Sequence, residues 1–138
     1  MYPPELVAPM KGELTEVGFQ QLLTSDEVDS VLNNKQGTAL VVVNSVCGCA
    51  ARMARPGLKL ALSQSSKKPE KLTTVFAGVD RESTERAREY MLPYPPSSPS
   101  IALFKDGKLV HFLERHHIEG RPAELIAENL KAAFNEHC

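Results

Sequence analysis

The sequence TALVVVNSVCGC, residues 38–49, joins an unbroken apolar run to a pair of closely spaced cysteines. Residues 38–43 show no polar alternation, which is typical of a strand that is covered on both faces in a parallel or mixed α/β sheet. From Cys47 onward, apolar residues follow helical spacing as far as Leu62. The stretch therefore predicts a central strand that turns directly into a helix, with Cys47 at the turn.

The segments that follow alternate between strand and helix patterns. Pro56 lacks a backbone N–H, so it should kink or interrupt the helix after the cysteines. Residues 72–79 predict a second strand, and the order strand, helix, strand is that of a right-handed crossover unit. Residues 81–92 predict a short polar helix, which the proline-rich residues 93–99 must end. These elements predict an α/β fold.

A hairpin and a final helix complete the pattern. Apolar runs at residues 101–105 and 108–113 flank Asp106-Gly107, and Asp-Gly between such runs is a strong hairpin signal. Pro122 suits the first turn of a helix. One apolar stripe at helical spacing follows it: Ala123, Ile126, Ala127, Leu130, Ala133 and Phe134. We expect a mixed sheet of about four strands, flanked by helices.

Two features precede the central strand. The segment through Lys11 is rich in proline and small residues, so we expect an extended arm over the surface. Residues 24–27, TSDE, resemble a capping box, and apolar residues at helical spacing follow, so a helix should run to about Asn33. We therefore expect one domain over the whole chain, with the arm and this helical extension in residues 1–36 and the core fold in residues 38–138.

Composition places the chain among compact globular proteins. Its 138 residues are 42% hydrophobic and 24% charged, and a net charge of −1 offers no general attraction to nucleic acid or anionic lipid. The longest apolar run, residues 39–43, is far shorter than the roughly 20 residues that span a bilayer. The first residues have no signal-peptide character, so we expect a cytoplasmic location, with no membrane and no nucleic acid as partner.

Cysteine usage is the most informative part of the composition. There are three cysteines: Cys47 and Cys49 form a close pair, and Cys138 is the last residue. An odd count does not suit a disulfide framework, and close pairs in a reducing compartment are more often catalytic, redox-sensing or metal-binding. Because Cys47 falls where a strand becomes a helix, unpaired backbone N–H groups and the helix dipole should favour its thiolate. Cys47 is therefore the candidate nucleophile.

The spacing of the pair bears on its chemistry. Side chains two residues apart in a regular helix diverge by about 200°, so a disulfide between Cys47 and Cys49 needs local distortion, which Gly48 permits. The short ring should still be strained, and strained disulfides are the labile ones. We therefore expect the pair to exchange readily. Two buried cysteines that act only as small hydrophobic residues are the alternative.

Three further residues lie near the pair or share its chemistry. Arg52 lies three positions beyond Cys49, with Arg55 another turn on, so Arg52 is placed to reach an anionic thiol substrate or to favour the Cys49 thiolate. A solvated helix face is the alternative. Cys138 either pairs with the other thiols or, as we expect of a chain end, is a mobile terminal thiol.

A metal site is the second interpretation of the cysteine pair. Two thiolates could hold a soft ion such as Cu(I) or Zn(II), but structural zinc needs four ligands. His116, His117 and His137 show no regular ligand spacing and there is no second cysteine pair, so we expect loop histidines and no metal. A third interpretation is an interaction module without turnover.

The order of elements resembles the thioredoxin fold over nearly the whole chain. Residues 98–107, SPSIALFKDG, are similar to that fold's proline, apolar strand and Lys-Asp-Gly turn. The resemblance implies that Pro99 is in the cis form and that Ser98-Pro99 faces Cys47, where the substrate backbone docks. Only about 5% of such bonds in folded proteins are cis, so this isomer is inferred from the resemblance alone.

More narrowly, the chain resembles the bacilliredoxins, a bacterial family that uses Cys-Gly-Cys where thioredoxins use Cys-X-X-Cys. The similar residues include NSVCGCAA at 44–51 and Arg55-Pro56-Gly57. The opening MYPP and the closing residues 130–134 with Cys138 also fit the family. The resemblance therefore extends from one end of the chain to the other.

The bacilliredoxin resemblance implies removal of bacillithiol from mixed disulfides on proteins. Cys47 would attack and take the low-molecular-weight thiol onto itself, and Cys49 would resolve. Gly48, Ser98-Pro99 and Arg52 are the candidate substrate-binding residues. The implied partners are S-thiolated client proteins and bacillithiol or another low-molecular-weight thiol as co-substrate, with no bound cofactor. General protein disulfide reduction or isomerisation, or a soft-metal-binding Cys-X-Cys module, is the alternative.

Overall fold

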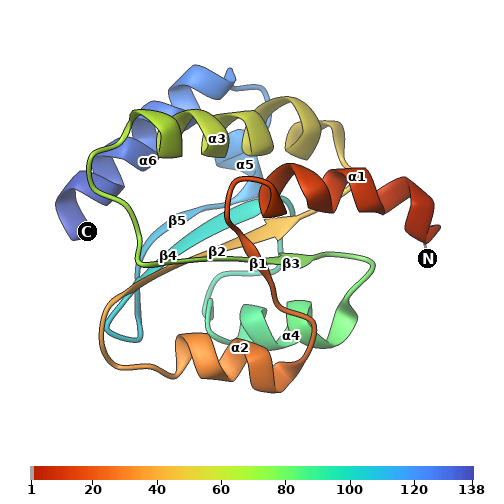
Figure 1. Cartoon of the computed structure of the whole chain (residues 1–138), viewed down its shortest axis with the longest axis horizontal. Coiled ribbons are helices and arrows are strands. Elements are labelled where there is room, and N and C mark those ends of the chain that lie inside the picture. Colours follow the sequence, from red (N-terminus) through yellow and green to blue (C-terminus); the bar gives the residue numbers. More distant parts are fainter. Residues whose placement is uncertain (1) are drawn as a thin grey trace.

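Five strands form one mixed sheet at the centre of the computed structural model, which describes residues 2–138 (Figure 1). In chain order they are β1 (Gln20–Gln21), β2 (Thr38–Asn44), β3 (Lys71–Phe76), β4 (Ser100–Lys105) and β5 (Lys108–Leu113). Across the sheet the order is β1-β3-β2-β4-β5. β3 is parallel to both β1 and β2, whereas β4 is antiparallel to β2 and to β5. The sheet is thus mixed, as the sequence predicts.

Helices cover both faces of this sheet. They are α1 (Pro4–Thr15), α2 (Ser25–Leu32), the π-helical turn η1 (Ala50–Ala54), α3 (Arg55–Gln64), α4 (Arg81–Glu89), α5 (Arg115–Ile118) and α6 (Ala123–His137). Figure 1 shows α1, α3 and α6 on one side of the sheet and α2 and α4 on the other. No helix within residues 2–138 combines the length and the apolar character that a bilayer-spanning segment needs.

The central strand β2 is buried along its whole length. Leu40 and Val42 belong to the core that α3 and α6 complete, whereas Val41 and Val43 belong to the core toward α2 and α4. Successive side chains of a strand point to opposite faces, so an unbroken apolar run fills both cores at once. The prediction of a doubly covered strand is confirmed.

Two local predictions from the sequence are also confirmed. The Thr24 hydroxyl accepts the backbone N–H of Glu27 at 3.2 Å, and the Glu27 carboxylate accepts the backbone N–H of Thr24 at 3.2 Å, which is the capping box that starts α2. Between β4 and β5, Asp106 and Gly107 take φ values of 53° and 81°. These left-handed conformations form the tight turn of the hairpin.

The N-terminal segment is a helix, so the expectation of an extended arm through Lys11 is wrong. α1 begins at Pro4, where the missing N–H of proline costs no helical hydrogen bond. Val7 and Leu14 are buried, so one side of α1 contributes to the core. A first helical turn accommodates proline well, and a high proline content near a chain end is therefore compatible with a helix.

The remaining differences concern short elements and boundaries. β1 and α5 have two and four residues, too few to show a periodic pattern in the sequence. β3 ends at Phe76 rather than Val79, and α4 ends at Glu89 rather than Leu92. Counting β1, the sheet has five strands rather than about four.

One edge of the sheet collects the segments that carry the cysteines and the proline loop. Asn44 at the end of β2 pairs with Phe76 at the end of β3, and Val43 lies opposite Ser100 at the start of β4. The residues that follow β2 and those that precede β4 therefore emerge side by side. We therefore expect the functional site at this edge of the sheet.

Candidate active site

Cys47 lies at the start of the helix that follows β2. Its carbonyl accepts the first helical hydrogen bonds, from the N–H of Ala50 at 3.0 Å and of Ala51 at 3.1 Å. Its sulfur accepts the backbone N–H of Cys49 at 3.3 Å. Cys47 thus occupies the position of a helix N-cap, where a side chain satisfies an otherwise unpaired N–H. The structure places it at the strand-to-helix turn that the sequence predicts.

The two cysteines are close enough to interact but are not bonded. Both are half-buried free thiols, and each affects the pKa of the other. The expected divergence of about 200° applies to two helical residues. Cys47 precedes the helix as its cap, so that argument does not hold here, and the side chains can meet across the exposed Gly48.

The environment of Cys47 favours its thiolate. Partial burial alone would raise the pKa of this thiol. Hydrogen bonds from the backbone and thiol of Cys49, the positive charge of Arg115 and the N–H of Ala50 outweigh burial, so the pKa of Cys47 lies below that of an ordinary thiol. A thiolate is the nucleophilic form of cysteine, which makes Cys47 the better nucleophile of the pair.

Cys49 has the opposite environment. Burial raises the pKa of its thiol, and the neighbouring Cys47 and the negative charge of Glu119 raise it further. The charge of Arg115 acts against these effects without overcoming them. At neutral pH the pair therefore consists of a sulfur poised for attack at Cys47 and a protonated thiol at Cys49.

A buried arginine supports the turn that carries Cys47. Arg55 is 1% exposed. Its Nε donates to the Glu13 carboxylate of α1 at 2.8 Å, and its Nη1 donates to Asn44 Oδ1 at 2.9 Å. The same Nη1 donates to the carbonyl of Ser45 at 3.1 Å, and the Ser45 hydroxyl accepts the N–H of Cys47 at 3.2 Å. This connected network fixes the end of β2, from which the cysteine turn begins.

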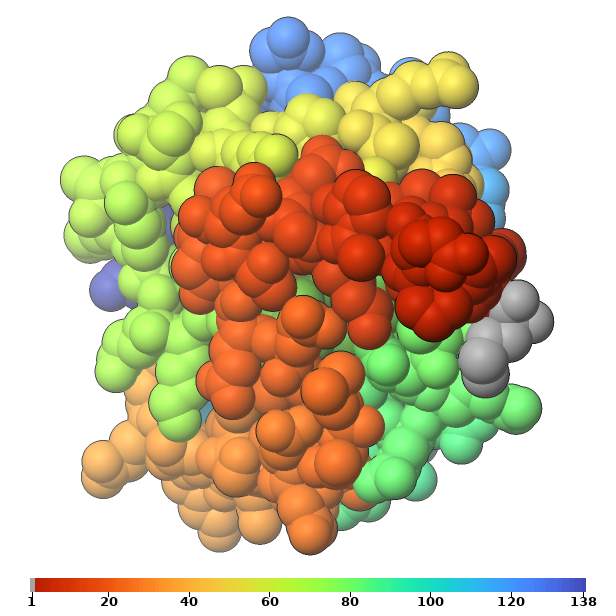
Figure 2. Space-filling view, turned by 45° about the vertical axis from the view of Figure 1, so that its right-hand side comes forward, coloured from red at the N-terminus to blue at the C-terminus, as the bar shows by residue number. Residues whose placement is uncertain are grey.

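The network also explains the position of α1. In Figure 2, α1 (red) lies against the yellow segment that carries the cysteine turn. Besides the Glu13 contact, the carbonyl of Met10 accepts a hydrogen bond from Asn44 Nδ2 at 3.2 Å. The N-terminal helix therefore helps to hold the strand end from which the cysteine turn begins.

The inward direction of Arg55 differs from the solvated helix face considered for the arginines of this segment. The helix after the cysteines contains η1, in which the N–H of Arg55 bonds to the carbonyl of Ala50. Pro56 has no N–H to continue a regular helical ladder, and this confirms the predicted interruption. The wide turn changes which residues share a face of the helix. Regular helical spacing therefore does not predict that Arg55 points inward.

The proline loop meets the cysteine turn. The Ser98–Pro99 bond is cis, as the resemblance implies, and Pro99 is buried while Ser98 is half-buried. Arg115 connects this loop to the pair: its Nη1 donates to the carbonyl of Ser98 at 3.4 Å and its Nη2 lies 3.8 Å from the sulfur of Cys49. Ser98-Pro99 therefore belongs to the same site as the cysteines.

Arg115 and Glu119 are the site residues that the sequence analysis missed. Arg115 Nε donates to the Glu119 carboxylate at 2.8 Å, and the Arg115 backbone N–H donates to the hydroxyl of Ser97 at 3.3 Å. Both residues belong to α5 or its end, 66 residues or more along the chain from Cys49. No local pattern in the sequence links such distant positions.

Arg52 lies beside the cysteine pair. Within residues 2–138, its side chain makes no hydrogen bond with either sulfur. It is exposed, and a Cβ atom added to Gly48 would lie 3.8 Å from its Nη2. Its guanidinium therefore lies next to Gly48, which is itself exposed. Substrate binding by Arg52 and Gly48 remains a prediction.

His116 and His117 lie in α5 and His137 ends α6, so the expectation of loop histidines is wrong. Within residues 2–138, no hydrogen bond or ion pair joins a histidine or Cys138 to the cysteine pair. His116 and His117 group with Glu114 within 4.8 Å, and His117 Nδ1 accepts the backbone N–H of Glu114 at 3.0 Å. Cys138 is exposed and lies close to Thr38, at the opposite end of β2 from the pair. A seven-residue strand spans roughly 20 Å, so Cys138 cannot pair with the other thiols of its own chain.

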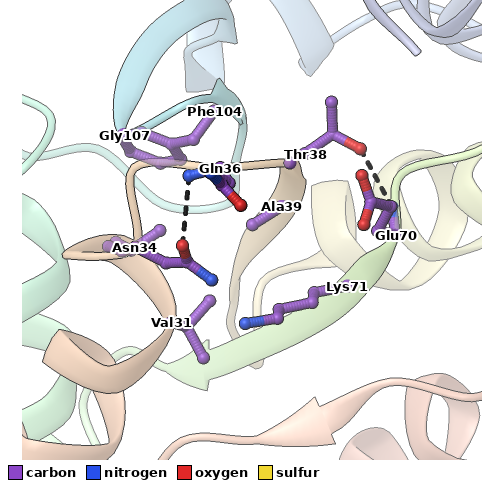
Figure 3. A pocket seen from close by; sticks show the side chains of 11 residues that line it. Val31, Asn34, Gln36, Thr38, Ala39, Glu70, Lys71, Phe104 and Gly107 are labelled. Carbon is purple, nitrogen blue, oxygen red and sulfur yellow. Dashed lines mark hydrogen bonds between the residues drawn. The ribbon is translucent and has the colours of Figure 1, made fainter.

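A small cavity of about 60 Å³ lies at that same far end of the sheet (Figure 3). Thr38, Glu70 and Asn34 line it, and the Thr38 hydroxyl accepts the N–H of Glu70 at 3.0 Å. Because Thr38 starts β2 and Cys47 follows its end, this cavity is separate from the cysteine site.

Solved structures identify the class of fold. A thioredoxin from Fasciola hepatica superposes with a TM-score of 0.57 at 20% identity, covering 87% of this chain and 100% of the thioredoxin. Mitochondrial thioredoxin 3 from Saccharomyces cerevisiae gives 0.57 at 18% identity, covering 90% and 98%. The protein therefore has the thioredoxin fold, with its two thiols where the central strand meets a helix.

Sequence relatives identify the family. A bacilliredoxin from Cytophaga hutchinsonii is 60% identical over 136 residues, which is 99% of each chain. A bacilliredoxin from Halalkalibacterium halodurans is 52% identical over 137 residues, covering 99% of this chain and 94% of the relative. The disulphide isomerase family model matches residues 2–138. The chain belongs to the bacilliredoxin family and is a thiol–disulfide oxidoreductase.

Proposed function

We propose that this oxidoreductase reduces mixed disulfides between client proteins and a low-molecular-weight thiol, with bacillithiol as the favoured thiol. The observation that carries the proposal is the hydrogen bond from the Cys49 N–H to the Cys47 sulfur, which stabilises a nucleophilic thiolate at a half-buried position. The names of the bacilliredoxin relatives support bacillithiol as the thiol.

The first step transfers the small thiol to the enzyme. The Cys47 thiolate attacks the sulfur of the low-molecular-weight thiol in the mixed disulfide, and the client thiolate leaves and takes up a proton. One S–S bond breaks and one forms, so Cys47 now carries the small thiol. The client has been reduced without any bound cofactor.

The second step removes the small thiol from Cys47. Cys49 loses its proton and attacks the Cys47 sulfur, which releases the small thiol and leaves a Cys47–Cys49 disulfide. Alternatively, a second molecule of the small thiol attacks the adduct, frees the Cys47 thiolate and leaves as the symmetric disulfide. The first route leaves an oxidised pair that a further thiol reductant must reduce, whereas the second consumes one molecule of the small thiol. A reducing cytoplasm supplies both, and this is the compartment we propose.

Ser98-Pro99, Gly48 and Arg52 are the proposed substrate-binding residues. Ser98-Pro99 offers backbone next to the sulfurs, and Gly48 leaves the approach to Cys47 free of a side chain. The exposed guanidinium of Arg52 offers a partner for a carboxylate of an anionic thiol. With a net charge of −1 the chain has no general attraction to nucleic acid or anionic lipid, so S-thiolated proteins and the small thiol are the proposed partners.

A second candidate is general reduction or isomerisation of protein disulfides. The description of the matching family, disulphide isomerase, favours it. The same two thiols would then attack a disulfide between two protein cysteines. The two functions differ in what Cys47 carries after the first step, a small thiol or a protein.

The test is to trap that intermediate. A Cys49→Ala variant, treated with a client protein that carries bacillithiol, should accumulate a Cys47 adduct whose added mass is that of bacillithiol less two hydrogens. Cys138→Ala is the matched control and should behave as the wild type. An adduct of client protein in place of the small thiol would support the second candidate, and no adduct on Cys47 would overturn both.

A further inference from the structure

Arg115 makes four contacts at the active site. Its Nη2 lies 3.8 Å from the sulfur of Cys49, and its Nη1 donates to the carbonyl of Ser98 at 3.4 Å. Its Nε donates to Glu119 at 2.8 Å, and its backbone N–H is held by the Ser97 hydroxyl. The guanidinium is therefore positioned by the proline loop and by α5 and is directed at a reacting atom.

We propose that Arg115 is a catalytic residue that stabilises negative charge on the sulfurs of Cys49 and Cys47 during exchange, and that Glu119 opposes it. The inference rests on the proposed roles of the two thiols. It adds a charged pair from α5 to a site otherwise formed by the cysteine turn and the proline loop.

The resolving step shows why such a group is needed. When Cys49 attacks the adduct on Cys47, its thiol gives up a proton and its sulfur becomes negative before the new S–S bond forms. The released thiolate of the small thiol then takes up a proton, so charge and protons balance. The guanidinium stays charged throughout the reaction because arginine does not deprotonate in proteins. Its charge is present whenever the sulfur becomes negative.

Cys49 has few other sources of stabilisation. The sulfur of Cys47 is held by backbone N–H groups at the helix start. Burial, Cys47 and Glu119 all favour the protonated form of Cys49, and Arg115 favours its thiolate. Arg115 also favours the thiolate of Cys47, so one guanidinium acts on both sulfurs.

Glu119 acts in the opposite direction. Its carboxylate pairs with Arg115 and lies close enough to Cys49 for its negative charge to disfavour a thiolate there. Arg115 and Glu119 are 46% and 57% exposed, and an exposed ion pair of this kind adds little to folding stability. The pair therefore matters more for the charge of the sulfurs than for the fold.

Within residues 2–138, no other charged group around the turn makes a hydrogen bond or ion pair with the sulfurs. Arg52 of η1 lies next to Gly48, and Arg55 of α3 pairs with Glu13 of α1. From α5, Arg115 and Glu119 face the pair directly. The pH dependence of the two thiols should therefore respond to these two side chains with opposite signs.

The experiment measures the pH dependence of alkylation of Cys47 and Cys49 by iodoacetamide in the reduced full-length protein, with each site read by peptide mass spectrometry. Iodoacetamide is neutral, so surface charge does not steer the reagent. We expect Arg115→Gln to slow alkylation of both thiols near neutral pH by roughly three- to tenfold. Arg115→Lys should keep most of the wild-type rate, and Glu119→Gln should raise it.

A matched pair elsewhere serves as the control. Arg81 and Glu85 of α4 form an exposed ion pair with the same spacing, at 3.7 Å. Arg81→Gln and Glu85→Gln should leave both alkylation profiles unchanged. Thermal unfolding of each variant shows whether the fold is retained.

Two results would overturn the inference: unchanged profiles in Arg115→Gln, or shifts of the same sign in Arg115→Gln and Glu119→Gln. If Arg115→Gln failed to fold, the Arg115→Lys and Glu119→Gln profiles would still decide. Alkylation needs no client and no bacillithiol. Absence of wild-type activity on mixed disulfides, together with the expected alkylation shifts in the variants, would therefore count against the proposed function and leave the role of Arg115 intact.

Discussion

The backbone N–H of Cys49 donates a hydrogen bond to the sulfur of Cys47 at 3.3 Å. Cys49, which resolves the proposed intermediate, therefore also stabilises the Cys47 thiolate that forms this intermediate. This is possible with a single intervening residue because Cys47 caps the helix and Cys49 is already inside it. The short spacing thus gives the Cys47 sulfur a backbone N–H donor, whereas the ionisation of Cys49 depends on the charge of nearby side chains.

Ionisation of the two cysteines should change folding stability with opposite signs. The pKa of Cys47 is lower in the folded protein, so its contribution is present above the ordinary thiol pKa of about 8.5 and is lost as pH falls through the folded value. The advantage of the reduced wild type over Cys47→Ser in unfolding free energy should therefore grow as pH rises. Urea unfolding across this pH range measures it.

For Cys49 the sign reverses. Its pKa is raised in the folded protein, so its contribution is present below the ordinary thiol pKa and is lost as pH rises through the folded value. The advantage of the wild type over Cys49→Ser should shrink with rising pH. Parallel curves for the two serine variants would contradict the assignment of opposite environments.

The Glu13–Arg55 pair should couple the N-terminal helix to the active site. Glu13→Gln leaves the buried guanidinium without its carboxylate, which costs about 3 kcal/mol of unfolding free energy, the lower end for a buried pair because Glu13 is 36% exposed. Cys47 should also alkylate more slowly, because the turn loses support. Chemical unfolding and alkylation measure the two effects.

Lys59 provides the comparison for this prediction. It also approaches Glu13, at 3.6 Å, but it is 38% exposed. Lys59→Ala should cost less than about 1 kcal/mol and leave the Cys47 rate unchanged. Equal effects from Glu13→Gln and Lys59→Ala would show that Arg55 does not depend on its buried contact.

Gly57 should be required for the packing of α3 on α6. A Cβ atom at this position would lie 2.8 Å from Cγ2 of Ile126 and 3.2 Å from the carbonyl of Ala123. Gly57→Ala should therefore lower the unfolding free energy by about 1–3 kcal/mol. In α1 the same change at Gly12 meets no atom closer than 3.9 Å, so Gly12→Ala should stabilise by about 0.5–1 kcal/mol. Thermal unfolding of both variants tests the contrast.

The local part of this molecule could be predicted from sequence. The apolar run of β2 and the cysteines are contiguous, so their strand-to-helix turn follows from neighbouring residues alone. The capping box at Thr24 and the turn at Asp106-Gly107 are local in the same sense. Each of these features is decided by interactions within a few positions of the chain.

The parts that depend on tertiary structure could not be predicted. The direction of Arg55 depends on a wide helical turn that shifts the face of every later residue. Arg115 reaches Cys49 only because the sheet brings α5 beside the cysteine turn. The helix at Pro4 shows a different failure, since proline suits both an extended arm and the first turn of a helix.

The most direct test is a pH titration of Cys47 itself in the reduced chain, followed by site-resolved alkylation with Cys138 as the internal reference. Burial raises the pKa of Cys138, and this thiol lies at the opposite end of β2. The account predicts that Cys47 reaches half of its maximal rate at a lower pH than an ordinary thiol, and lower than both Cys49 and Cys138. A midpoint for Cys47 at or above that of Cys138 would contradict it.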